Sequence, residues 1–158
     1  MDPQEKGDFT EALGFAALHE LKNMHGDFVL TIHRSSPELD ARGIDCLVEI
    51  RLPSDSEKRT MTVPIEFKSS AQGVEKWKVV HSDLYKAGVL VFALPHEMSR
   101  RNRRRLMYRA LKRVQLNSLD GTLYHSMFQM LFRGGSRNLW RNIKLIRKRR
   151  AQERSRKK

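Results

Sequence analysis

The chain has 158 residues, 39% of them hydrophobic, and a formal net charge of +13. This length allows one domain with a buried core and a modest extension, and the lack of any long apolar run excludes a transmembrane helix. The polar first eight residues are unlike a signal peptide, and the single cysteine, Cys46, excludes an internal disulfide, so we expect a cytoplasmic protein.

The charge is divided unevenly along the chain. Residues 1–95 carry 11 Lys/Arg and 15 Asp/Glu, a net charge of −4, whereas residues 96–158 carry 20 Lys/Arg and 3 Asp/Glu, a net charge of +17. Dense positive charge attracts polyanions and gains affinity by releasing their counterions. We expect an acidic core over 1–95, a basic helical extension over 96–149 and a disordered basic tail over 150–158; a solvated charged tail without a partner is the alternative.

The acidic half is predicted to begin with a helix over 8–23. Asp8 and Glu11 have the spacing of a capping box, which would start the helix at Asp8. A strand over 28–33 and a polar loop over 34–43 follow. The expected buried face of the helix consists of apolar residues at helical intervals, namely Leu13, Ala17, Leu21 and Met24.

Two alternating runs, 44–52 and 60–68, surround a turn over 53–59 and predict a β-hairpin. Pairing residues whose numbers sum to 111 gives an unbroken apolar face, and a slip by one residue would place apolar groups opposite polar ones. Pro64 is a mild objection because it removes a ladder donor. The expected pairs are Ile44 with Phe67, Cys46 with Ile65, Val48 with Val63, and Ile50 with Met61.

Helices and one strand are expected after the hairpin. A helix over 71–81 can be capped by Ser70, and the continuous apolar run over 88–94 is typical of a buried strand. A basic helix is expected over 98–117, followed by helices over 123–132 and 138–149. The inner face of the basic helix is predicted to contain Leu106, Ala110, Leu111 and Val114.

The hairpin register also predicts a functional site. It places Asp45 opposite Glu66, with Lys68 on the same side, and directly opposed residues have Cβ atoms roughly 5 Å apart. Two carboxylates that close repel, whereas a divalent cation such as Mg²⁺ between them reverses the sign of the interaction. An ammonium alongside can hold a water or steady a phosphate. The pattern therefore predicts a metal–phosphate site suited to phosphodiester hydrolysis, against the alternative of a solvated hairpin face.

These residues resemble a known family. Ile44-Asp45, followed by Ile65-Glu66-Phe67-Lys68, is similar to the PD-(D/E)xK, or restriction-endonuclease-like, nuclease superfamily, as is the order helix, three strands, helix, strand. The segment Lys6-Gly7-Asp8-Phe9-Thr10-Glu11 resembles the Lys-Gly-x-x-x-Glu opening of the archaeal Holliday-junction-resolvase-like branch. The resemblance covers residues 6–95, and Ile44 stands where the family name has proline.

The resemblance implies an α/β restriction-endonuclease-like core and assigns roles to its residues. Lys68 would be the catalytic lysine and Gln72 a supporting residue. Two alternatives stay open. Asp40 could be the acid of the site in place of Asp45, and Glu20 could take the place of Glu11 if Glu11 only caps the helix. The implied ligands of Mg²⁺ or Mn²⁺ are the side chains of Asp45, Glu66 and Glu11 and the backbone carbonyl of Phe67. The three side chains would also be catalytic residues.

The basic half is expected to bind the nucleic-acid backbone. The expected function is a Mg²⁺-dependent DNA endonuclease, with RNA as another possible partner and a homodimer as one possible state. The alternatives are a non-catalytic DNA- or RNA-binding protein that keeps the fold, and an assembly factor that docks on an acidic protein. The expected phosphate contacts are Arg100, Arg101, Arg103, Arg104, Arg105, Arg141 and Lys144.

Overall fold

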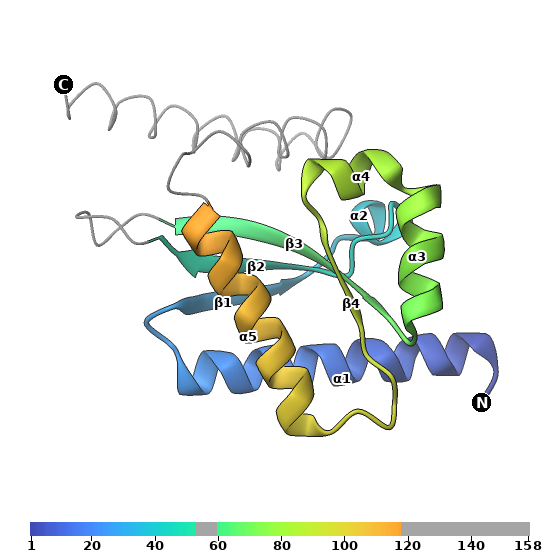
Figure 1. The fold of residues 1–158 in the computed structure, drawn as a ribbon, viewed down its shortest axis with the longest axis horizontal. Coiled ribbons are helices and arrows are strands. Elements are labelled where there is room, and N and C mark those ends of the chain that lie inside the picture. The colour runs from blue at the N-terminus through green and yellow to red at the C-terminus, as the bar shows by residue number, and fades with distance from the viewer. Residues whose placement is uncertain (53–59, 118–158) are drawn as a thin grey trace.

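A four-stranded mixed sheet organises the part of the chain that the computed structural model describes, residues 1–52 and 60–117 (Figure 1). The first three strands form an antiparallel meander, and the fourth lies parallel to the third at one edge. The α/β class is therefore confirmed. The strands, in their order across the sheet, are β1 (Val29–Arg34), β2 (Cys46–Arg51), β3 (Thr60–Lys68) and β4 (Leu90–Ala93).

The first helix, α1 (Pro3–Met24), begins five residues before the predicted start. Asp2 is its cap: the Glu5 N–H donates to Asp2 Oδ1 at 2.8 Å, and the Asp2 N–H donates to Glu5 Oε2 at 3.0 Å. The predicted capping box of Asp8 with Glu11 is wrong, because Pro3 suits the first helical position and Asp2 precedes it.

The buried face of α1 also differs from the prediction. Met24 is 56% exposed, and Leu13 is only half-buried. The helix covers the sheet with a neighbouring stripe, because the residues that pack into the core are Phe15, Ala17, Leu18 and Leu21.

The hairpin register is confirmed for three of its four predicted pairs. Cys46 pairs with Ile65, Val48 with Val63, and Ile50 with Met61, and all six side chains are buried. Pro64 is accommodated because its imino side faces β4, whose pairing with β3 begins only at the next residue, Ile65. The fourth pair, Ile44 with Phe67, lies beyond the regular ladder, since β2 begins at Cys46.

Two short helices were not expected. The predicted loop over 34–43 contains α2 (Pro37–Ala41), where the Leu39 N–H donates to the Ser36 Oγ at 3.3 Å. The helix α4 (Ser82–Ala87) follows α3 (Ala71–Val80). The predicted cap of α3 is confirmed, because the Gly73 N–H donates to the Ser70 Oγ at 3.0 Å.

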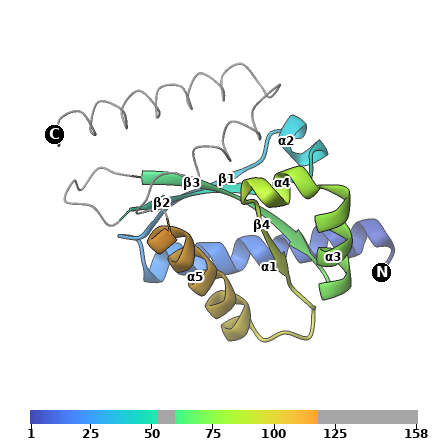
Figure 2. The same cartoon turned by 45° about the horizontal axis from the view of Figure 1, so that its top comes forward.

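The basic helix α5 (Arg100–Asn117) packs with α1 on one face of the sheet, while α2 and α4 lie on the other side (Figure 2). Leu106 is 38% exposed, so its predicted place on the inner face is wrong, and Ala110 is only partly buried. The buried stripe recurs at intervals of four and three residues, as one face of a helix does, and consists of Met107, Leu111 and Val114.

Several predictions fall on other parts of the chain. The turn over 53–59, the helices over 123–132 and 138–149 and the tail over 150–158 lie outside the described residues. Within the described ranges, no helix combines the length and apolar character needed to cross a membrane.

Candidate functional site

The candidate site lies where the chain enters β2 beside the end of β3. Gly43 has a φ of 88°, a left-handed conformation that favours glycine, and a Cβ there would lie 2.8 Å from Trp77 Nε1. After this turn, the Ile44 N–H donates to the Leu39 carbonyl at 3.1 Å, and the Asp45 N–H donates to the Ile65 carbonyl at 2.9 Å. These bonds fix the backbone of Asp45 just before the first residue of β2.

The carboxylate of Asp45 takes the place of a backbone acceptor. The Phe67 N–H, on the side of β3 that faces β2, donates to Asp45 Oδ2 at 2.7 Å. In an uninterrupted antiparallel ladder a main-chain carbonyl would accept this bond. The register predicted a ladder pair of Asp45 with Glu66. Instead, Asp45 lies before the ladder and reaches β3 through its side chain.

Glu66 is a buried carboxylate with only one of its oxygens paired. The residue is 4% exposed, and its Oε1 lies 2.8 Å from the Nζ of Lys68. Its Oε2 is buried and has no hydrogen-bond partner among the described residues. Burial of an unpaired carboxylate oxygen is unfavourable, so this atom identifies a position where a cation or donor would stabilise the protein.

The carboxylates of the site influence each other electrostatically. Burial, and then the negative charge of Glu66, raise the pKa of Asp45 from its ordinary value of 3.8 to about 7. Burial also raises the pKa of Glu66, although Lys68 acts in the opposite direction. The site therefore holds two acidic groups whose joint ionisation is costly without added positive charge.

Glu11 of α1 lies near enough to Asp45 to be influenced by its charge. Burial, followed by the negative charge of Asp45, raises its pKa. Arg34, at the end of β1, lies 3.3 Å from Glu11 through its Nη1, and its guanidinium lies 4.1 Å from the centre of the Phe15 ring. Sequence reasoning missed Arg34, because its position beside Glu11 depends on how α1 lies on the sheet.

The structure separates the alternative acids. Asp40 is exposed, yet close enough to raise the pKa values of Glu11 and Glu66, so it lies at the margin of the cluster. Glu20 belongs elsewhere, because its carboxylate forms ion pairs with Arg100 and Arg104 of α5. Of the two helix carboxylates, Glu11 is the one placed near Asp45.

The site's chemistry fits a hard divalent cation. Its donors are carboxylate oxygens, and Glu66 Oε2 is an orphaned buried acceptor. The Phe67 carbonyl faces the same side as its N–H, toward Asp45, because both groups of a strand residue point to one neighbour. Within 1–52 and 60–117, no three His, Cys, Asp or Glu side chains converge as a complete ligand set. A bound Mg²⁺ or Mn²⁺ would therefore retain water or substrate oxygens, as Mg²⁺ commonly does.

Lys68 and Gln72 lie on opposite sides of the turn from β3 into α3. The Lys68 stem lies under the start of α3, where a Cβ at Gly73 would be 3.5 Å from Lys68 Cβ. Its ammonium is held by Glu66 at 2.8 Å. Gln72 is exposed, and no contact with the acidic cluster supports its expected role.

The predicted phosphate contacts on α5 divide into two groups. Arg100 and Arg104 form ion pairs with Glu20, and the guanidinium of Arg103 donates to the Met98 carbonyl. The two ion pairs join α5 to α1, whereas the bond of Arg103 lies at the start of α5 itself. Arg101 and Arg105 are exposed, whereas Arg141 and Lys144 lie outside the described residues.

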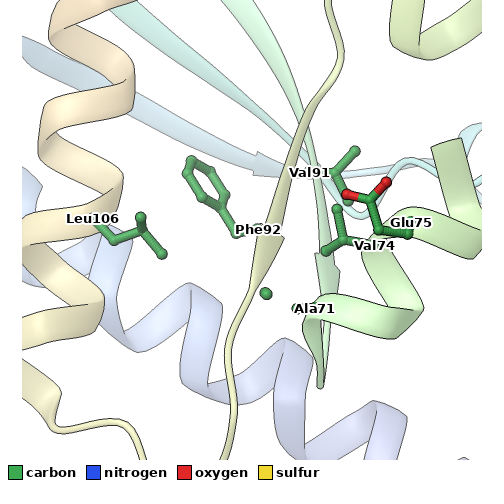
Figure 3. A pocket seen from close by; sticks show the side chains of 7 residues that line it. Ala71, Val74, Glu75, Val91, Phe92 and Leu106 are labelled. Carbon is green, nitrogen blue, oxygen red and sulfur yellow. The ribbon is translucent and has the colours of Figure 1, made fainter.

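A hollow of about 200 Å³ lies between β4, α3 and α5 (Figure 3). The side chains around it are mostly apolar, with Glu75 as its acidic member, and they do not include Asp45 or Lys68. The hollow is separate from the acidic cluster and offers no comparable group of reactive side chains.

Comparison of the chain with family models, curated proteins and solved structures found no match. The functional interpretation therefore depends on the residues and their geometry.

Proposed function

We propose that the chain is a Mg²⁺-dependent DNA endonuclease with a restriction-endonuclease-like core. The observation that carries the proposal is the pair of Asp45 with the buried Glu66, in which the pKa of Asp45 is raised and Glu66 Oε2 has no hydrogen-bond partner among the described residues. A surface hairpin gains nothing from such a pair. A divalent cation would neutralise it and satisfy the free oxygen.

The order of elements supports the same proposal. A helix carrying Glu11 precedes an antiparallel meander, Asp45 stands at the entry to β2, and Glu66 and Lys68 stand at the end of β3. The strand β4 then lies parallel to β3. The PD-(D/E)xK pattern noted in the sequence implies this arrangement of acids and lysine.

The side chains have distinct tasks in this proposal. Asp45 is held in position by the Phe67 N–H, and Glu66 holds the Lys68 ammonium at 2.8 Å. Lys68 can donate to a phosphate oxygen or orient a water for in-line attack. When bound, Mg²⁺ supplies Lewis acidity at the phosphate and lowers the pKa of a water.

The uneven charge of the chain fits a polyanionic substrate. The acidic cluster alone would repel a phosphate backbone, whereas residues 96–158 carry a net charge of +17. Positive charge on the same chain raises the local concentration of nucleic acid and compensates this repulsion.

A cleavage assay tests the function. The protein is incubated with linear, branched and single-stranded DNA in Mg²⁺ or in EDTA. We expect cutting in Mg²⁺ only, and loss of cutting in Asp45→Asn and Lys68→Ala. Asp83→Asn and Lys76→Ala change the same residue types at exposed positions outside the cluster and should cut normally. Equal cutting by all variants would remove these residues from the mechanism.

A non-catalytic nucleic-acid-binding protein is the second candidate. It is favoured by the absence of a third converging ligand within the described residues and by the ion pair that already occupies Lys68. This candidate predicts no cutting under any condition, with DNA binding that persists in EDTA and in Asp45→Asn.

A further inference from the structure

A groove of about 370 Å³ lies between the end of α1 and the first three turns of α5. Figure 1 shows α5 crossing the C-terminal half of α1. The α1 residues of the groove, Leu21 and Met24, lie 10 and 13 residues beyond Glu11, which is about 15–20 Å further along the helix. The groove is therefore distinct from the acidic cluster.

Four arginines of α5 line this groove, and three of them are exposed and have no ion-pair partner among the described residues. Arg101, Arg105 and Arg109 are exposed and recur every four residues on α5, so that successive side chains are displaced by about 6 Å along the helix. Like charges at this spacing destabilise a helix. None of the three forms an ion pair with the described part of the chain, whereas Arg104 beside them is paired with Glu20, which also pairs with Arg100. The row thus presents uncompensated positive charge.

The lining residues other than the arginines are aromatic or apolar. The rings of His25 and Tyr108 stack with their centres 4.6 Å apart and their planes at 28°. Leu21 and Met24 complete the wall from α1, and Met24 is 56% exposed. A ring surface beside a row of cations is the combination by which proteins bind unpaired bases and their backbone, since every base has a face that stacks.

We propose that this groove binds a single-stranded segment of nucleic acid. Arg101, Arg105 and Arg109 contact successive phosphates, and an unpaired base stacks on the face of His25 that Tyr108 does not cover. The inference rests on the proposed function for the class of partner, and it adds a substrate feature: an unpaired strand held at a place separate from the acidic cluster. Duplex DNA, whose bases are already stacked, gains only the phosphate contacts.

Fluorescence anisotropy with a labelled single-stranded oligonucleotide and a matched duplex tests this proposal in EDTA. A triple change of Arg101, Arg105 and Arg109 to Gln should weaken single-strand binding about tenfold to a hundredfold at about 0.1 M salt, and should reduce the slope of log K against log salt by about 2. The control is a triple change of Lys76, Lys78 and Lys86 to Gln, which removes the same charge from α3 and α4.

The aromatic contact has its own test. His25→Leu should weaken single-strand binding about tenfold and leave duplex binding unchanged, because the ring face that stacks on a base is lost. His25→Phe keeps a ring and should bind like the parent protein. Thermal unfolding of each variant identifies any that fail to fold. Equal binding by the arginine variant and the parent, or equal losses in the arginine and lysine variants, would overturn the proposal.

The same measurements separate this inference from the nuclease proposal. Asp45→Asn should lose cutting but keep single-strand binding in EDTA. Loss of binding in the arginine variant together with absence of any cutting would refute the nuclease and retain the groove. Cutting that depends on Asp45, together with unchanged single-strand binding in the arginine variant, would support the nuclease and refute the binding groove.

Discussion

Replacing Asp45 by Asn tests whether the proximity of the Asp45 and Glu66 carboxylates lowers the free energy of unfolding. The amide oxygen can still accept the hydrogen bond from the Phe67 N–H, which is 2.7 Å in the parent, but the charge facing Glu66 is removed. The pKa of Asp45 is raised in the folded protein, from 3.8 to about 7. The folded protein therefore favours the protonated form of Asp45. The contribution of Asp45 to stability is fully present below about pH 4 and is lost as the pH rises through about 7.

The size of the effect follows from this shift. A rise in the pKa of Asp45 from 3.8 to about 7 corresponds to about 4 kcal/mol above pH 7. Asp45 is partly exposed, and solvent weakens its interactions, so we expect about 2 kcal/mol in practice. The Asn variant should therefore match the parent near pH 4 and exceed its free energy of unfolding by about 2 kcal/mol near pH 8.

Urea unfolding, followed by circular dichroism from pH 4 to pH 8, measures this difference. Adding Mg²⁺ at pH 8 should raise the stability of the parent and leave Asp45→Asn unchanged, because a ligand of the folded state stabilises it. Asp83→Asn, at an exposed position of α4, serves as the control. Parallel pH profiles for the parent and Asp45→Asn would refute the idea that Asp45 and Glu66 oppose each other's ionisation.

Two further predictions concern α1, and urea unfolding at neutral pH measures both. Gly14→Ala should destabilise the protein by about 1–3 kcal/mol, since a Cβ would lie 2.6 Å from the Phe67 ring. Gly7→Ala, with nothing within 4 Å of its Cβ, should stabilise it by about 0.5–1 kcal/mol; equal effects of the two changes would argue against this packing of α1. Asp2→Ala should cost about 1 kcal/mol because the cap is lost, whereas Asp8→Ala should cost much less; the reverse order would place the start of the helix at Asp8.

Local patterns predicted the hairpin well. Alternation decides which side chains face the core, and the apolar face permits one register, so Cys46, Val48 and Ile50 could be paired with their partners from the chain alone. Because Glu66 and Lys68 are two residues apart on β3, their common side also followed from strand geometry. The first helix was less predictable, because Asp8 and Glu11 have the spacing of a capping box although the helix begins at Pro3 with Asp2 as its cap.

The rest of the site depends on tertiary packing. The bond from the Phe67 N–H to Asp45 requires the chain to leave the ladder at Cys46, and no local pattern specifies that departure. The same holds for Arg34 beside Glu11, which depends on how α1 crosses β1. The pairing of Glu20 with Arg104 depends on the contact of α1 with α5, far apart in sequence.

Calorimetric titration of the protein with Mg²⁺ or Mn²⁺ tests the central claim most directly. At pH 8 we predict binding of the cation by the parent and by Asp83→Asn, and its loss in Asp45→Asn and Glu66→Gln. Absence of binding by the parent, or equal binding by all four proteins, would contradict a metal site between Asp45 and Glu66.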